Sequence, residues 1–380
     1  MGSGTTNVVA KTHGIHSVGV EAHPFVFKIT EAKLNWDIAQ TDVLDFVKYI
    51  QDNLHVKAQA LKKTRVPEKE FPELILKCYT TETIYDLWAL RELFNNHTLS
   101  DGLRRFFFVV ITALLRGVST AATGWPYIAP NKKKVTSIDK DVLEEFCALS
   151  WQMSRDIDNI KAISNDRYTA SQHSIFRGDS RNTVGIIDTA SVDHVFTSPP
   201  YLNNFDYADR TRLELYFWGE ANSWGEISAK IRTKLMTSAT TQISRKDPQY
   251  RMSPEFTEEC PEVAEFVNQA VTTLAQRRLV KGGKKSYDLL VTGYFNDIHL
   301  ILRDVFRVLK SNTHALFVLG DSAPYGVHIP TDELIGKIGL DVGFSNYHIE
   351  ILRQRGGKWK DNPQRHSVAL RESIVVLDKD

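Results

Sequence analysis

The segment 198–201, Ser198-Pro199-Pro200-Tyr201, combines residue types that could hold and orient an amino group. The hydroxyl of Ser198 and the backbone carbonyl of Pro199 are both hydrogen-bond acceptors toward such a group. Two adjacent prolines stiffen the loop that presents these acceptors. Tyr201 offers an aromatic face on which a planar base could stack, a contact worth about 1–3 kcal/mol. The segment therefore predicts a site that binds an amino group attached to an aromatic ring.

Such an arrangement suits the transfer of a methyl group to an exocyclic amino nitrogen. The lone pair of this nitrogen is delocalised into the ring, so acceptors for its hydrogens are needed to align the lone pair for in-line attack on a sulfonium methyl. A base in a duplex must first be flipped out, at a cost of roughly a few kcal/mol. This chemistry needs neither a metal nor a covalent nucleophile, and histidines such as His23, His194 and His366 show no metal-ligand spacing.

The elements that position this loop are those of an α/β protein. A strand is expected over 192–196, directly before the loop, and further strands are expected over 174–176, 315–319, 347–352 and 373–377, with a helix over 331–338. Residues 37–165 have helical periodicity instead, with helices expected over 44–54, 81–94 and 103–115. We interpret this region as a helical insertion.

The chain begins with a glycine- and threonine-rich segment that contains Gly2, Gly4, Thr5 and Thr6. A helix is expected next, over 7–13, followed by a strand that ends in Glu21 and by a second helix from Pro24. This order is typical of a glycine loop that leads into a helix. Taken alone, the glycines could also belong to a disordered terminus or to a remnant of a linker, since Gly-Ser-Gly is a common linker composition. Glu21 could cap the helix that starts near Pro24.

Composition sets limits on the class of protein. The chain has 380 residues, 42% of them hydrophobic, and a net charge of +1, so it can form a large core but shows no overall basicity. Its cysteines, Cys78, Cys147 and Cys260, lack the paired spacing of a zinc site or disulfide framework and indicate a reducing, intracellular setting. No apolar run reaches about 18 residues, and no signal peptide is evident. We expect a cytoplasmic protein without membrane contact.

In its loop motif the sequence resembles the amino-methylating, site-specific DNA methyltransferases. Within that family it is similar to the cytosine-N4 type, which carries Ser-Pro-Pro-Tyr where adenine enzymes more often carry Asp-Pro-Pro-Tyr. The segment 198–201 matches residue for residue, and Gly178-Asp179-Ser180 and Asn204-Phe205-Asp206-Tyr207 also look like the family. The resemblance covers most of the chain except the helical insertion.

The resemblance implies S-adenosyl-L-methionine as the cofactor. By similarity, the cofactor loop consists of Gly2, Gly4, Thr5 and Thr6. Glu21 would bind the ribose hydroxyls, and Asp179 would contact the adenine amino group of the cofactor. On residue type alone, Asp179 could instead be a turn residue.

The implied fold is a Rossmann-like methyltransferase with a mostly parallel sheet and helices on both faces. Residues 1–36 and 166–380 would form the catalytic domain, and 37–165 the insertion. In the family a strand precedes the cofactor loop, and here that first strand is absent. We expect either a truncated reading frame or an upstream polypeptide that supplies the strand. Its loss would weaken the cofactor site and makes activity of this chain alone doubtful.

The implied function is methylation of the 4-amino group of cytosine in a flipped-out DNA base, in a restriction-modification or related defence system. The 6-amino group of adenine, an amino group in RNA, and a catalytically silent DNA-binding partner subunit are the alternatives. One basic cluster suits phosphate contact, although a solvated loop would have the same composition. It consists of Arg353, Arg355, Lys358, Trp359, Lys360 and Arg365.

Overall fold

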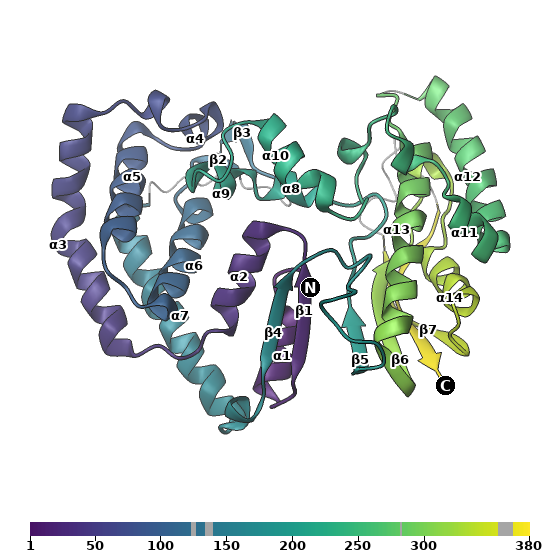
Figure 1. Ribbon diagram of the computed structural model, residues 1–380. Helices are drawn as coiled ribbons and strands as arrows, with labels where there is room; N and C mark the ends of the chain where they lie inside the picture. Colours follow the sequence, from purple (N-terminus) through teal and green to yellow (C-terminus); the bar gives the residue numbers. More distant parts are fainter. Residues whose placement is uncertain (123–126, 134–139, 282, 356–367) are drawn as a thin grey trace. The chain divides into compact units, whose positions relative to one another are not determined.

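The computed structural model describes residues 1–122, 127–133, 140–281, 283–355 and 368–380 (Figure 1). These residues form two compact units. Unit 1 comprises Met1–Arg177 and Tyr207–Thr233, and unit 2 comprises Gly178–Asp206 and Lys234–Asp380. Each unit is therefore assembled from segments that are distant in the sequence.

Unit 1 is built mainly of helices. Its helices are α1 (Thr5–Thr12), α2 (Pro24–Leu34), α3 (Gln40–Thr64), α4 (Glu73–Cys78), α5 (Thr81–Asn96), α6 (Asp101–Gly117), α7 (Val142–Ser164), α8 (Tyr207–Arg210), α9 (Arg212–Phe217) and α10 (Trp224–Lys230). Its strands are β1 (Ser17–Glu21), β2 (Ala121–Ala122), β3 (Ala129–Lys133) and β4 (His173–Arg177). Strands β1 and β4 pair in parallel, with Glu21 opposite Arg177, and β2 pairs with β3 in antiparallel fashion.

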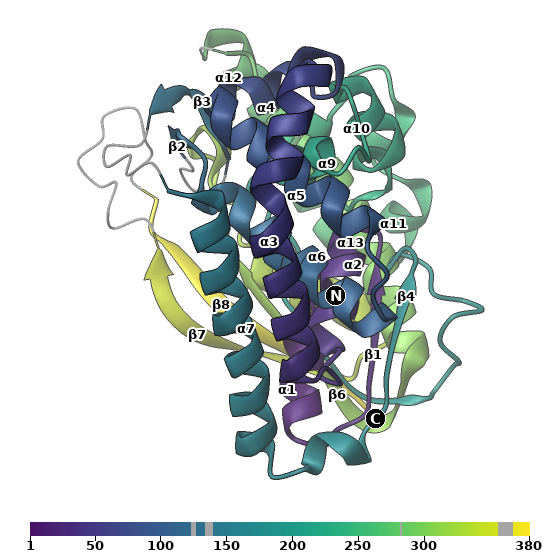
Figure 2. The ribbon, with the colours of Figure 1, turned by 90° about the vertical axis from the view of Figure 1, so that its left-hand side faces the viewer.

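The long helices of unit 1 each bury an apolar face. Helix α6 starts after Ser100, whose hydroxyl accepts a hydrogen bond from the backbone N–H of Leu103 at 3.4 Å. Its buried side chains recur every three or four residues: Leu103, Phe106, Phe107, Val110, Ile111, Leu114 and Leu115. Helix α6 packs on α7, which packs on α3, and α3 lies beside α5 (Figure 2).

The helices expected in the region 37–165 are confirmed. The predicted ranges 44–54, 81–94 and 103–115 lie within α3, α5 and α6. All of these helices belong to unit 1, together with α1, β1, α2 and β4. The assignment of 37–165 as an insertion into a catalytic domain formed by 1–36 and 166–380 stays a prediction.

Unit 2 contains a four-stranded sheet with the order β5-β6-β8-β7. Its strands are β5 (Val192–Thr197), β6 (Leu309–Gly320), β7 (Asn346–Arg355) and β8 (Leu370–Lys379). Its helices are α11 (Pro254–Glu259), α12 (Pro261–Val280), α13 (Tyr287–Val308) and α14 (Thr331–Asp341). Strands β5 and β6 are parallel, whereas β8 runs antiparallel to both of its neighbours, β6 and β7.

The chain has the expected α/β character, but the described strands do not confirm a mostly parallel sheet. In the four-stranded sheet only the β5–β6 pair is parallel. The expected strands over 315–319, 347–352 and 373–377 are all present as parts of β6, β7 and β8. An alternating apolar pattern predicts a strand without predicting its direction, and here β8 returns between β6 and β7.

The core of unit 2 lies between this sheet and helices α12, α13 and α14. Ala315, Phe317 and Leu319 alternate along β6 and are fully buried, in one cluster with Tyr294 and Ile298 of α13. Burial of each large apolar side chain stabilises the unit by about 1.5–3 kcal/mol. This packing fixes the end of β6 and the start of β8, the two strand ends that neighbour the loop after β5.

Among the residues that the structure describes, no helix combines the length and apolar character needed to cross a membrane.

Candidate active site

The loop 198–201 leaves the carboxyl end of β5 in unit 2. Strand β5 ends at Thr197, opposite Phe317 of β6, so the strand expected directly before the loop is confirmed. Ser198 is exposed, Pro199 is buried, and the next residue after the loop, Leu202, lies in the core with 3% of its surface exposed. The loop is thus anchored by apolar contacts while its serine is accessible.

Tyr201 is held at its hydroxyl and on its ring. The hydroxyl donates a hydrogen bond of 2.8 Å to Glu372 Oε1, and the guanidinium carbon of Arg355 lies 5.2 Å from the ring centroid in a cation–π contact. Burial raises the pKa of Tyr201 to about 12, the contact with Glu372 adds to the rise, and a hydrogen bond with Ser198 opposes it. At neutral pH the phenol is therefore protonated and acts as the donor.

Glu372 lies near the beginning of β8, between its neighbouring strands. It is opposite Gly320 in β6 and opposite Arg353 in β7. Arg353 Nε forms an ion pair with Glu372 Oε2, and the Glu372 side chain is only 13% exposed. Burial alone would raise the pKa of Glu372, but the hydrogen bonds from Arg353 and Tyr201 outweigh burial and hold it below its ordinary value.

Arg355 reaches the ring of Tyr201 across Gly320. Its Nη1 donates to the backbone carbonyl of Asp321 at 3.2 Å. A Cβ atom on Gly320 would lie 2.1 Å from this nitrogen, so the guanidinium occupies space that any side chain would fill. Arg353 and Arg355 belong to the basic cluster singled out in the sequence. Its other members, Lys358, Trp359, Lys360 and Arg365, lie outside the described residues.

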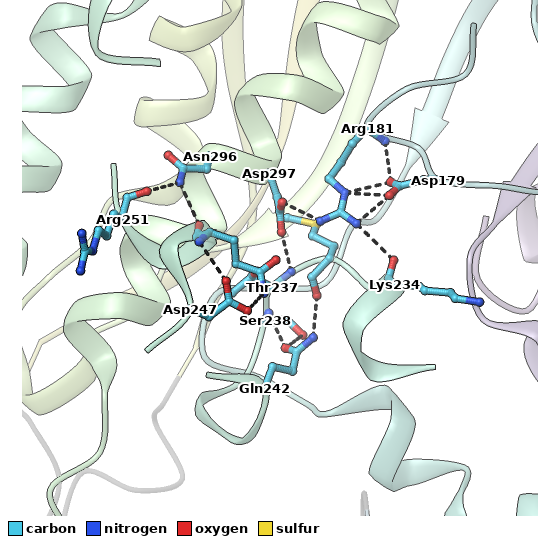
Figure 3. A network of polar contacts seen from close by, with 12 residues as sticks. Asp179, Arg181, Lys234, Thr237, Ser238, Gln242, Asp247, Arg251, Asn296 and Asp297 are labelled. Carbon is cyan, nitrogen blue, oxygen red and sulfur yellow. Dashed lines mark hydrogen bonds and ion pairs between the residues drawn. The ribbon is translucent and has the colours of Figure 1, made fainter. Parts of the chain in front are cut away.

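Asp179, the residue expected to contact the cofactor adenine, is paired with Arg181 (Figure 3). Its Oδ1 accepts from the backbone N–H and from Nε of Arg181, both at 2.9 Å, and its Oδ2 accepts from Nη2 at 2.6 Å. The segment also forms a turn, in which Asn182 N–H donates to the Asp179 carbonyl at 3.1 Å. Both sequence-based interpretations of Asp179 therefore remain compatible with its geometry.

Arg181 bridges Asp179 and a second carboxylate, Asp297 of α13. Its Nη1 donates to Asp297 Oδ1 at 2.9 Å. Burial would lower the pKa of Arg181, but its contacts with Asp179 and Asp297 hold it above the ordinary value. Only 7% of Asp297 is exposed, so Arg181 compensates a carboxylate that is largely removed from water.

The polar network continues from Asp297 to Thr237, Ser238 and Gln242 (Figure 3). Asp297 Oδ2 accepts from the backbone N–H of Thr237 at 2.7 Å. The adjacent Ser238 donates its hydroxyl to the carbonyl of Phe205 at 2.9 Å, and its N–H bonds to Gln242 Oε1 at 2.7 Å. Asp179 is thereby connected, through side chains and backbone, to the segment that follows the loop.

In unit 1, the glycine loop and Glu21 lie together. The Gly2 N–H donates to Glu21 Oε2 at 2.7 Å, and the His23 N–H donates to Glu21 Oε1 at 2.8 Å. Strand β1 ends at Glu21, as expected, and His23 is the residue before α2. One carboxylate therefore bonds both to the glycine loop and to the start of the following helix.

Gly4 is the point of closest packing in the glycine loop. It is buried and adopts a left-handed φ of 75° directly before α1. A Cβ atom at Gly4 would lie 2.3 Å from Thr30 Cγ2, and the Thr30 hydroxyl donates to the Gly2 carbonyl at 3.1 Å. Thr5 and Thr6 are exposed in the first turn of α1, where backbone N–H groups lack helical partners.

The structure thus gathers the predicted site residues into two groups. Unit 1 brings Glu21 together with Gly2, and it places Gly4, Thr5 and Thr6 in the same loop and helix start. Unit 2 contains Asp179 and the loop 198–201.

Sequence reasoning missed the roles of Arg181, Asp297, Arg355 and Glu372. A signal existed for Asp297, because a carboxylate stands there on the apolar, buried face of a helix. Such a residue needs a buried partner. The identity of that partner, 116 residues away, had no local signal.

Comparison with curated proteins finds type II methyltransferases that align with the whole chain. M.BsoBI from Geobacillus stearothermophilus is 26% identical over 418 residues, covering 100% of this chain and 79% of the relative. M.AvaI from Nostoc sp. is 22% identical over 399 residues, with 79% of the relative covered, and M.MvaI from Kocuria varians is 20% identical over 405 residues, with 83% covered. No family model matches the chain, and no solved structure gives a significant match.

These alignments include every candidate residue described above. Because they cover 100% of the chain, the glycine loop, Asp179 and the loop 198–201 all fall inside the matched region. The comparisons give no support to the upstream polypeptide considered from the sequence. The relationship expected from the sequence is confirmed: the chain is a relative of the type II DNA methyltransferases.

Proposed function

We propose that this protein transfers a methyl group from S-adenosyl-L-methionine to the exocyclic 4-amino group of cytosine within a specific DNA sequence, in a restriction-modification or related defence system. The main support for this proposal is the position of the loop 198–201 at the carboxyl end of β5, in a chain related over its whole length to type II methyltransferases. Ligands of Rossmann-like proteins bind outside the carboxyl ends of their strands, and we propose that fold for the catalytic part. The cytoplasmic location stays a prediction.

The chemical roles follow from the groups in the loop. The Ser198 hydroxyl and the Pro199 carbonyl accept hydrogen bonds from the amino group, which aligns its lone pair with the methyl group. Pro200 stiffens the loop. The ring of Tyr201, whose phenol is protonated at neutral pH, stacks on the flipped-out base.

The glycine loop and Glu21 fit the proposed cofactor, which supplies a methyl group bound to a positively charged sulfur. Each Glu21 oxygen accepts one backbone N–H, and a carboxylate has about four lone-pair sites, so acceptors remain for two ribose hydroxyls. Nothing lies within 4 Å of the Cβ position of Gly2, so a ligand can approach the backbone there. We further propose that Gly4 sets the start of α1, that Thr5 and Thr6 line the cofactor, and that Asp179 accepts from its adenine amino group.

The test is transfer of labelled methyl groups from S-adenosyl-L-methionine to mixed-sequence DNA, with analysis of the methylated base. We expect 4-methylcytosine from the wild type and, for Ser198→Ala, a rate about 100-fold lower, the scale seen when one transition-state hydrogen bond is removed. Tyr201→Ala should lose the stacking face and be similarly impaired. Ser345→Ala is the matched control, because Ser345 is an exposed serine beside the opposite end of β7.

Other products would redirect the proposal. Labelled 6-methyladenine would identify adenine as the target, and label in RNA alone would replace DNA as the substrate. Binding of DNA without binding of S-adenosyl-L-methionine would identify a silent DNA-binding subunit.

A further inference from the structure

The ring of Tyr201 can serve as a stacking surface only if its orientation is fixed, and the structure holds both ends of the side chain. At the backbone end, the neighbouring Leu202 is buried in the core of unit 2. At the far end, the phenol oxygen donates to Glu372 Oε1 at 2.8 Å. Because the phenol oxygen lies on the axis of the Cβ–Cγ bond, a hydrogen bond there fixes the position of the ring but not its rotation about that axis. The guanidinium of Arg355, whose carbon lies 5.2 Å from the ring centroid, opposes that rotation by packing on the ring.

The acceptor is itself immobile. Glu372 belongs to β8 and is paired with strands on both sides. Its second oxygen is engaged by Arg353, so the carboxylate cannot turn to follow a moving ring without breaking an ion pair. Hydrogen bonds to a charged acceptor are roughly twice as strong as neutral ones. The sheet thus helps to set the position of the phenol oxygen through Glu372, in addition to the contact that the oxygen makes with Ser198 in the loop.

We infer that Glu372 is a positioning residue for the target base, acting through the Tyr201 hydroxyl. This inference rests on the proposed function of the loop 198–201. Without Glu372 the ring keeps its aromatic face but loses its fixed position, so the base is stacked less tightly and its amino group is aligned less well with Ser198 and Pro199. The expected loss in kcat/KM is about tenfold, the equivalent of one hydrogen bond to a charged group.

A double-mutant cycle separates this role from a general contribution to the sheet. The variants are Glu372→Ala, Tyr201→Phe and the combination of both, assayed for methyl transfer to DNA. If Glu372 acts through the hydroxyl, Glu372→Ala lowers kcat/KM about tenfold in the wild-type background and causes no further loss once Tyr201 is phenylalanine. Glu372→Gln retains an acceptor oxygen and should restore most of the activity lost in Glu372→Ala.

Two further variants support the double-mutant cycle, one as a control and one as a replacement for Glu372→Ala. Glu350→Ala removes an exposed carboxylate from β7 in the same sheet and should leave kcat/KM unchanged. If Glu372→Ala fails to fold, as judged by its thermal unfolding, Glu372→Asp takes its place, because it withdraws the carboxylate by one methylene and keeps the charge.

The outcomes are distinct. A loss from Glu372→Ala that is equally large in the Tyr201→Phe background overturns the inference, since Glu372 would then support the sheet without acting through the ring. Unchanged kcat/KM in Glu372→Ala overturns it as well. Failure of the proposed function shows in the wild type itself, which would then transfer no methyl group to DNA under any condition, and the inference would fall with it.

Discussion

The loop 198–201 in unit 2 and the glycine loop in unit 1 are fixed by different means. The first is held by side chains: Tyr201 bonds to Glu372, and the following segment is connected through a polar network to Arg181. The second is held by backbone N–H groups that donate to Glu21 and by close packing at Gly4. We therefore expect the first to be sensitive to the removal of charged partners and the second to the addition of a single carbon atom.

The largest effect is expected from Arg181→Ala in unit 2. The substitution leaves Asp297, 7% exposed, without its cationic partner. Removal of one partner of a buried ion pair typically costs about 3–5 kcal/mol, and the free energy of unfolding measured in denaturant should fall by an amount near the lower end of this range. The free energy of unfolding of Arg181→Lys, which keeps the charge but loses the planar fork, should lie between those of the wild type and Arg181→Ala. A loss below about 1 kcal/mol would show that side-chain charges do not hold this region.

In unit 1, Gly4→Ala should be destabilising where Gly2→Ala is tolerated. Both glycines have a left-handed φ, which costs an alanine about 1 kcal/mol. Only at Gly4 would the added Cβ also meet Thr30, 2.3 Å away, and overpacking adds about 1–3 kcal/mol. Thermal unfolding of the two variants measures the difference directly. Equal shifts in Tm would show that backbone conformation, not close packing, limits this loop.

Glu21→Gln tests whether the carboxylate serves the cofactor or only the helix after it. A glutamine can replace the acceptor toward one N–H group but offers a weaker acceptor to ribose hydroxyls, so the affinity for S-adenosyl-L-methionine should fall about tenfold. Calorimetric titration provides the measurement, with Glu31→Gln on α2 as a control of the same type in the same unit. Unchanged affinity would assign Glu21 to the backbone of the glycine loop and α2 alone.

The smallest effect is expected from protonation of Glu372, which accepts the hydrogen bond from the Tyr201 hydroxyl. The folded-state pKa of Glu372 is lowered, so its contribution to stability is complete above the pKa of an unfolded glutamate, about 4.3. That contribution is lost as the pH falls through the lower folded-state pKa. The Tm of the wild type should therefore fall more steeply below about pH 4.3 than that of Glu372→Gln. Parallel curves would mean that Glu372 is not a source of acid sensitivity.

The sequence predicts the elements and not the contacts between them. Strand β5, the loop after it and the order of α1, β1 and α2 are recovered because periodicity, glycines and prolines are local signals. The direction of β8 has no such signal, and its antiparallel course is what places Glu372 beside Tyr201. Arg181 and Asp297 likewise meet through tertiary structure alone, across 116 residues.

The positive charge near Tyr201 depends on Gly320, a residue outside the loop 198–201. The guanidinium of Arg355 lies where the side chain of any other residue at position 320 would have to be. Because it is the far end of a long, flexible side chain, it would give way. Substitution there would move a positive charge away from the ring, and the added carbon would also crowd the backbone carbonyl of Arg371, 3.2 Å away. Selection or engineering can thus change the electrostatics around Tyr201 from a neighbouring strand, without any change in the segment 198–201.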